Sequence, residues 1–159
     1  MRRRALLASG TAALFPLVAS AQAGGSAFKP LRLAEVAKDA GILREVTEQS
    51  EKDYFFIPPL FRYRLSLRTE GRTERLNEDD VDTLKKWGTF VARPDFVANF
   101  EHKVELIEEQ VSQWVYWQTA LVQPFRDELL QGGALSVNTL LIGARRKQPL
   151  LLAIGFQST

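Results

Sequence analysis

The chain has 159 residues, of which 21 are lysine or arginine, 19 are aspartate or glutamate, one is histidine and none is cysteine. Without Arg2, Arg3 and Arg4 the balance becomes 18 basic against 19 acidic residues, so the composition gives no indication of binding to nucleic acid or to an anionic membrane. The lack of cysteine excludes disulfide bonds and thiol chemistry, so the hydrophobic core must stabilise the fold unaided.

Residues 1–23 have the organisation of a secretory signal peptide. Three arginines precede a mostly apolar stretch, residues 5–21, which is shorter than the ~20 residues of a membrane-spanning helix, and two Ala-x-Ala sites follow it. Cleavage is expected after Ala23, with cleavage after Ala21 as the alternative. Residues 24–159 are then predicted to form one bacterial periplasmic or secreted domain, with no membrane span after cleavage.

The export route has two readings. Arg3-Arg4-Ala5-Leu6-Leu7 resembles a twin-arginine export motif, and the alternative is a general-secretion signal that carries three arginines.

The first half of this domain combines a helix with strands. Apolar residues at near-helical spacing predict a helix from about Leu33 to Ala40. For residues 42–47 a strand is the alternative interpretation. Residues 54–57, three aromatic residues followed by Ile57, predict a strand that Pro58-Pro59 stops. Strict alternation of apolar and polar residues from Phe61 to Arg68 predicts a half-buried antiparallel strand.

A turn and a helix are predicted next. Glu70-Gly71 is typical of a tight hairpin, with residues 72–76 returning beside the preceding strand. Asn77 is a favourable N-cap, acidic residues 78–80 suit the first turn of a helix, and Gly88 is expected just past its end. Around Pro94 we expect packed connecting chain with at most one helical turn.

The second half is dominated by strands. Residues 104–108 and 113–118 predict two strands, Pro124 predicts the start of a short helix, and Gly132-Gly133 predicts its end. Two apolar runs then predict a hairpin, residues 135–142 and 150–156, with the second strand covered on both faces. The fold class predicted is α+β: a twisted antiparallel sheet or small barrel of about six strands, with two or three short helices.

Catalytic signals are weak. His102 is the only histidine, so zinc sites of the usual type and cysteine–histidine pairs are excluded, and no Gly-x-Ser-x-Gly motif presents a nucleophile. The acidic clusters, residues 78–82 and 108–109, are better explained by helix capping and turns than by a glycosidase pair. The sequence predicts no metal, no cofactor and no catalytic residue.

Two patterns point to binding. Trp114 and Tyr116 share one face of a strand and form a candidate aromatic platform, unless both faces are buried. Arg62, Arg64 and Arg68 form a cationic row suited to carboxylate or phosphate, unless Glu70, Glu74 or Glu105 neutralise it from neighbouring strands.

The function expected is therefore a non-enzymatic exported domain that binds an envelope partner protein or a small ligand through a sheet face or edge. The alternative is a carboxylate-dependent hydrolase of cell-envelope glycan or ester substrates, which would need two carboxylates opposed across a pocket.

Overall fold

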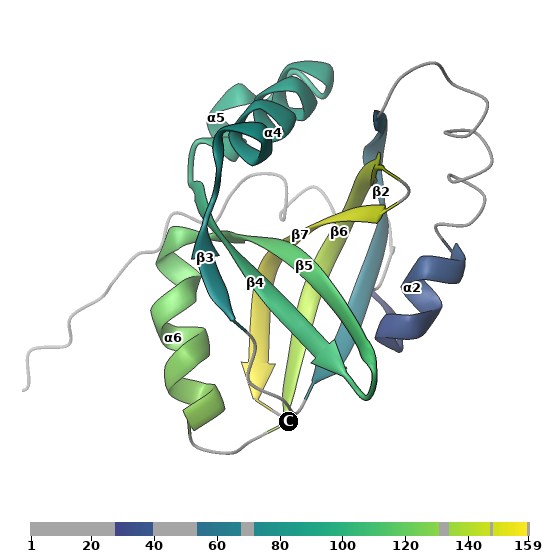
Figure 1. Cartoon of the computed structure of the whole chain (residues 1–159), viewed down its shortest axis with the longest axis vertical. Coiled ribbons are helices and arrows are strands. Elements are labelled where there is room, and N and C mark those ends of the chain that lie inside the picture. The colour runs from purple at the N-terminus through teal and green to yellow at the C-terminus, as the bar shows by residue number, and fades with distance from the viewer. Residues whose placement is uncertain (1–27, 40–53, 68–71, 131–133, 147, 159) are drawn as a thin grey trace, which may run out of the picture.

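A computed structural model describes residues 28–39, 54–67, 72–130, 134–146 and 148–158. They form an α+β fold around one open sheet in the order β1-β2-β6-β7-β5-β4-β3 (Figure 1). The strands are β1 (Lys29–Leu31), β2 (Tyr54–Leu67), β3 (Thr73–Arg75), β4 (Phe100–Glu108), β5 (Val111–Gln118), β6 (Leu135–Arg145) and β7 (Gln148–Ser158). The helices are α2 (Leu33–Asp39), α4 (Glu78–Phe90), α5 (Pro94–Val97) and α6 (Thr119–Leu130).

The α+β class is confirmed, and the details of the sheet correct the prediction. The sheet has seven strands, and it is mixed because β1 runs parallel to β2 and β5 runs parallel to β7. It is not closed into a barrel, because β1 and β3 remain at its two edges. The parallel pairs arise because chain segments that include a helix separate their strands, whereas short turns enforce antiparallel pairing.

The hairpin predicted at Glu70-Gly71 is wrong in its pairing. Strand β3 pairs with β4, with Glu74 opposite Lys103, and lies at the edge of the sheet farthest from β1. The turn residues themselves, like Arg68 and residues 42–47, lie outside the described residues.

Pro58-Pro59 do not stop their strand. Strand β2 runs through both, and its register with β6 shifts between Phe56 and Phe61. Proline lacks an N–H and is tolerated at a bulge, where the ladder of hydrogen bonds is already interrupted. Opposite the bulge, Gly143 has φ 147°, and a Cβ there would lie 1.9 Å from the Phe55 carbonyl oxygen, so only glycine allows β2 and β6 to approach this closely.

The predicted hairpin of β6 and β7 is present, and it forms the middle of the sheet. Residues 150–153 are buried, and their side chains alternate between two hydrophobic clusters on the two faces of the sheet. We call the face that carries α2 and α6 the inner face and the opposite one, which carries α4 and α5, the outer face. The continuous apolar run of β7 is explained by this cover on both sides.

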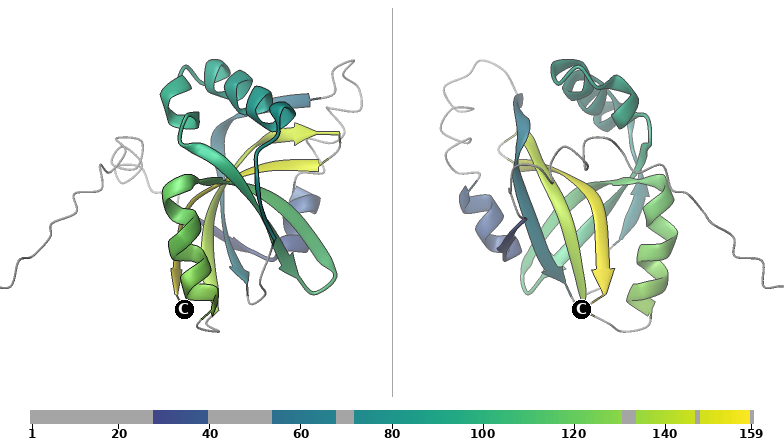
Figure 2. Two further views of the ribbon diagram at one scale, coloured as in Figure 1. Left: turned by 60° about the vertical axis from the view of Figure 1, so that its left-hand side comes forward. Right: turned by 180° about the vertical axis from the view of Figure 1, so that it is seen from behind.

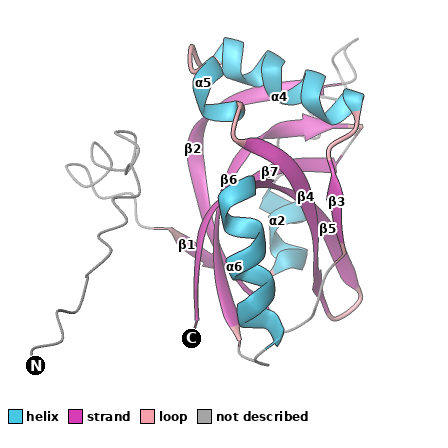
Figure 3. Cartoon of the chain, turned by 90° about the vertical axis from the view of Figure 1, so that its left-hand side faces the viewer, coloured by secondary structure: helices cyan, strands magenta, loops and turns pink. Residues whose placement is uncertain are grey.

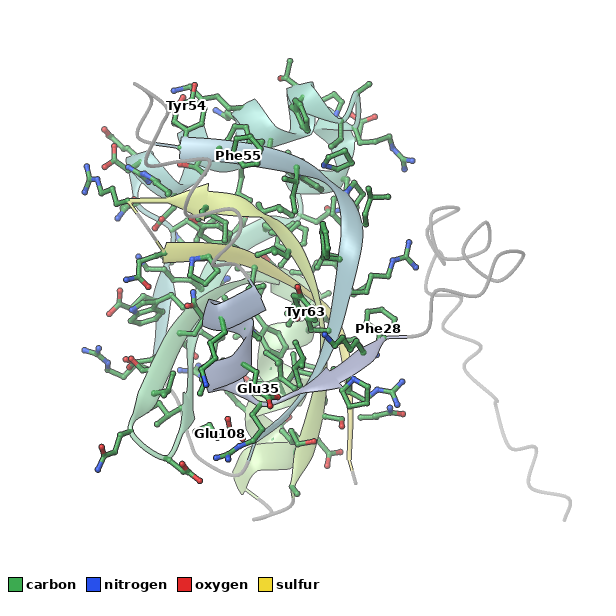
Figure 4. The ribbon with its side chains drawn as sticks, turned by 90° about the vertical axis from the view of Figure 1, so that its right-hand side faces the viewer. Phe28, Glu35, Tyr54, Phe55, Tyr63 and Glu108 are labelled. Atoms are coloured by element: carbon green, nitrogen blue, oxygen red, sulfur yellow. The ribbon has the colours of Figure 1, made fainter. Side chains whose placement is uncertain are left out.

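The sheet curls around the inner face. Cα atoms of β2 and β4 come within 8 Å although three strands separate them in the sheet, and Figure 2 shows the β4–β5 hairpin crossing over the remaining strands. Leu33 and Val36 of α2 and Val122 and Phe125 of α6 are buried in the inner cluster. In Figure 4, Glu108 lies towards one end of the sheet, and Tyr54 and Phe55 lie at the other end.

Helices α4 and α6 follow their predictions in part. Asn77 caps α4 in a capping box with Asp80, as expected, but the helix continues to Phe90 and includes Gly88. A Cβ at Gly88 would lie 2.8 Å from Val97 Cγ2, so this glycine is required by close packing against α5. Pro124 lies inside α6, which begins at Thr119 and not at the proline.

Candidate functional site

One cross-strand row on the outer face joins both predicted binding patterns. Arg62 lies opposite Leu140, Leu140 opposite Leu152, Leu152 opposite Tyr116, and Tyr116 opposite Lys103. Arg62 and Tyr116 are thus three strand spacings apart, about 14 Å along the sheet. The arginine row and the aromatic pair occupy the same face, but the structure does not bring them together into one site.

The arginine end of this row carries cations without carboxylate partners. Arg62 and Arg64 are half-buried, and Arg64 Nε donates a weak hydrogen bond to Asn138 Oδ1 at 3.4 Å. In the described part of the chain neither guanidinium has an ion pair. The residues opposite them on β6 are Leu140 and Asn138, and Pro30 of β1 lies opposite Arg64, so these cross-strand neighbours are uncharged.

Two of the expected carboxylate partners lie at the opposite edge of the sheet. Glu105 Oε2 accepts a hydrogen bond from Arg72 Nε at 2.8 Å, and Glu74 lies 4.0 Å from Lys103 Nζ. The predicted neutralisation of the arginine row by Glu74 or Glu105 is therefore wrong, because β3 and β4 are separated from β2 by β6, β7 and β5. Glu70 lies outside the described residues.

The aromatic end of the row is built differently. Tyr116 is buried, and its hydroxyl donates to Asp80 Oδ1 at 3.1 Å. Burial, with a smaller contribution from the Asp80 charge, raises the pKa of the Tyr116 phenol. Trp114 is half-buried, with Arg72 and Lys103 at 5.4 and 5.3 Å from its ring centroid. The accessible member of the predicted platform is therefore Trp114.

Asp80 links α4 to the sheet at this end. Its Oδ2 accepts a hydrogen bond from Lys103 Nζ at 2.9 Å, and its backbone N–H donates to Asn77 Oδ1 at 2.8 Å.

Glu105 is the second buried carboxylate at this end. The hydrogen bond that Arg72 donates, and after it the positive charge of Arg72, keep the pKa of Glu105 below its usual value despite burial. These two carboxylates, the most buried of those described, each face a cation and do not oppose each other across a pocket.

The remaining candidates from the sequence are the acidic pair at residues 108–109 and His102. Glu108 Oε2 accepts the backbone N–H of Leu33, and Glu109 pairs with Arg32, so this acidic cluster holds the start of α2. His102 lies on β4 beside Trp117, and its buried Nδ1 has no hydrogen-bond partner among the residues that the structure describes. In the described residues, no group of three His, Cys, Asp or Glu side chains is placed to hold a metal ion.

One cavity was not anticipated from the sequence. A pocket of about 530 Å³ lies between α4, α5, the end of β3 and the start of β4. Its walls are mainly apolar, and Arg75, Lys85 and Glu101 contribute its charged groups. Its residues come from four elements spread over 27 positions of sequence, from Arg75 to Glu101, so no short motif could have revealed it.

Comparisons with known proteins do not name a function. No protein-family model matches the chain, and no curated protein matches it. None of the helices that the structure describes is long and apolar enough to cross a membrane. The function therefore has to be inferred from the geometry of the outer face and the pocket.

Proposed function

We propose that the chain is an exported, non-enzymatic domain that binds an acidic partner protein or a small anionic ligand through the outer face of its sheet, at Arg62 and Arg64. The observation that carries the proposal is the contrast in charge along that face. Arg72 and Lys103 are neutralised by carboxylates, whereas no described carboxylate neutralises Arg62 or Arg64.

The chemistry of arginine supports an anionic ligand. A guanidinium presents several N–H donors in a planar fork that matches carboxylate or phosphate, and two neighbouring forks can hold one anion or two acidic side chains. Arg62 and Arg64 stand two residues apart on one strand, so their side chains leave the same face. A half-buried cation is less well hydrated than a free one, which strengthens its attraction to an incoming anion.

Nearby polar groups would contribute to such a site. Asn138 lies directly opposite Arg64, and Ser66 lies opposite Ser136 on the same face. Amide and hydroxyl groups donate hydrogen bonds to an anion without adding charge. Arg68 belongs to the proposed site by its position in the alternating pattern. Trp114 and Tyr116 lie at the far end of the row and are not part of it, because Tyr116 is buried and the cations beside Trp114 are paired with carboxylates.

Export is a separate part of the proposal and has its own test. The basic start, apolar stretch and Ala-x-Ala sites of residues 1–23 support secretion to the bacterial periplasm or medium. Mass spectrometry of the secreted chain should find an N-terminus at Gly24. Intact protein that still begins with Met1 would contradict cleavage.

The binding test uses matched arginine variants. The double variant Arg62→Ala/Arg64→Ala should lose about tenfold or more in affinity for inorganic phosphate or a poly-glutamate peptide, because charged hydrogen bonds contribute about 1.5–3 kcal/mol each. Arg126→Ala is the control, because Arg126 is exposed on α6. Capture from envelope extract by the wild-type chain, lost in the double variant alone, would extend the result to a natural partner.

Equal binding by wild type, the double variant and Arg126→Ala would contradict the arginine site. The alternative, a carboxylate hydrolase, has no supporting observation in the described residues, because the buried carboxylates Asp80 and Glu105 are held by Lys103 and Arg72.

A further inference from the structure

The pocket beside α4 is a second candidate binding site, and it shares no residue with the proposed arginine site. It lies at the end of the sheet where α4 and α5 form a layer across the strands (Figure 3). Its apolar walls include Leu76, Val81, Leu84, Pro94, Val97 and Phe100. A volume of about 530 Å³ falls within the range of pockets that enclose small organic ligands.

Part of the wall of this pocket is held by close packing. Leu84, Val97 and Phe100 belong to the outer hydrophobic cluster, and the close contact at Gly88 locks α4 against α5. The turn between these helices is closed by the backbone N–H of Arg93, which donates to Gly88 O at 2.8 Å. A pocket held by such packing is largely formed before a ligand arrives, which reduces the entropy lost on binding.

The charged residues that line the pocket indicate what net charge a ligand would carry. Arg75, Lys85 and Glu101 are exposed, and in the described part of the chain none of their side chains has a hydrogen bond or ion pair. Two cations against one anion favour a single negative charge. Glu101 disfavours a second negative charge on the ligand, because like charges repel each other.

We propose that this pocket binds a small amphipathic monocarboxylate, with an aliphatic or aromatic body between α4 and α5 and its carboxylate at Arg75 and Lys85. The apolar walls supply affinity in proportion to the apolar area that they remove from water. The cations supply orientation, and Glu101 discriminates against dianions. This activity goes beyond the proposed function and does not depend on it.

The test compares three eight-carbon probes on the purified chain by NMR titration. Octanoate should give saturable shifts at the amides of Val81, Leu84 and Val97, octanol should bind about tenfold more weakly, and octyl phosphate should also bind more weakly than octanoate. Arg75→Ala/Lys85→Ala should reduce octanoate affinity about tenfold and leave octanol unchanged. Glu101→Gln should reduce the discrimination against octyl phosphate.

A blocking variant tests the location. Ala98 is an exposed residue of the pocket lining, so Ala98→Trp should fill the cavity without disturbing the core and should abolish the shifts. Ala120→Trp, at an exposed position of α6, should leave them unchanged. The inference is overturned if octanoate gives no saturable shifts at the pocket, if Ala98→Trp leaves them unaltered, or if octanol binds as tightly as octanoate.

Discussion

The two ends of the outer-face row carry similar residues in opposite circumstances. At the β4–β5 end, Lys103 is held by Asp80 at 2.9 Å and Arg72 by Glu105 at 2.8 Å, and both cations lie against the ring of Trp114. At the β2 end, Arg62 and Arg64 face Leu140 and Asn138. The first end joins α4 to the sheet, and the second has charge that the described fold does not use.

This difference separates the cations that are paired with carboxylates from those that have no ion pair in the described residues. A cation already paired with a buried carboxylate must lose that partner before it binds another anion, and breaking such a pair is strongly unfavourable. Arg62 and Arg64 have no ion pair to break within the described residues, and Arg64 would give up only its weak hydrogen bond to Asn138. The β4–β5 end therefore contributes to stability, and the β2 end is the one that we propose for binding.

The largest effect is expected at Asp80. Asp80→Ala removes the acceptor of both Lys103 and Tyr116. Among the described carboxylates, the mostly buried Lys103 then keeps only Glu74 at 4.0 Å, and this loss should lower the free energy of unfolding by about 3 kcal/mol. Asp82→Ala is the control on the same helix, because Asp82 forms an exposed pair with Lys86 that contributes below ~0.5 kcal/mol. Chemical denaturation measures both, and equal losses would refute a structural role for this end.

A smaller effect is expected at Tyr116. Tyr116→Phe removes one buried hydrogen bond to Asp80 and should cost about 1 kcal/mol at neutral pH. Because the folded state raises the pKa of this phenol, its protonated form contributes stability that is fully present below the unfolded pKa of about 10. That contribution is lost as the pH rises through the higher folded pKa.

Thermal unfolding between neutral pH and pH 11 tests this linkage. Wild type should lose more stability above about pH 10 than Tyr116→Phe, which has no phenol to ionise. Parallel curves for the two proteins would show that Tyr116 is not shielded in solution as the structure indicates.

The smallest effect on stability is expected at the arginine end. Arg62→Ala and Arg64→Ala should each change the free energy of unfolding by less than ~0.5 kcal/mol, because neither guanidinium has an ion pair in the described residues. Lys103→Ala should be clearly more destabilising, since its side chain is 15% exposed and paired with Asp80. A loss at Arg62 or Arg64 as large as that at Lys103 would remove the contrast between the two ends.

Local patterns predicted local structure well. The capping residue Asn77 and its acidic neighbours placed the start of α4 correctly, and the alternation after Phe61 placed Tyr63 and Leu65 on a buried face. The apolar run of β7 predicted a strand covered on both faces. These features depend on backbone propensity and on side chains within one element, which neighbouring residues in sequence report directly.

The errors share one cause, which is that pairing and packing depend on distant residues. A hairpin was the simplest interpretation of Glu70-Gly71, yet β3 has its partner in β4, far along the chain. Pro58-Pro59 are tolerated because they lie in a bulge of β2, opposite Gly143 of β6. Pro124 is tolerated inside a helix whose buried face packs against Trp117 and Phe156, since tertiary packing can outweigh local propensity.

For the candidate site, the sequence alone determined which side chains share a strand face: Arg62 with Arg64, and Trp114 with Tyr116. Only the tertiary structure decided which of them have partners, because charge neutralisation depends on the order of strands in the sheet. That order placed Glu74 and Glu105 beside Lys103 and Arg72 and left the arginines of β2 next to uncharged neighbours. The same order, by bringing α4 and α5 over the ends of β3 and β4, also formed a pocket that no single segment encodes.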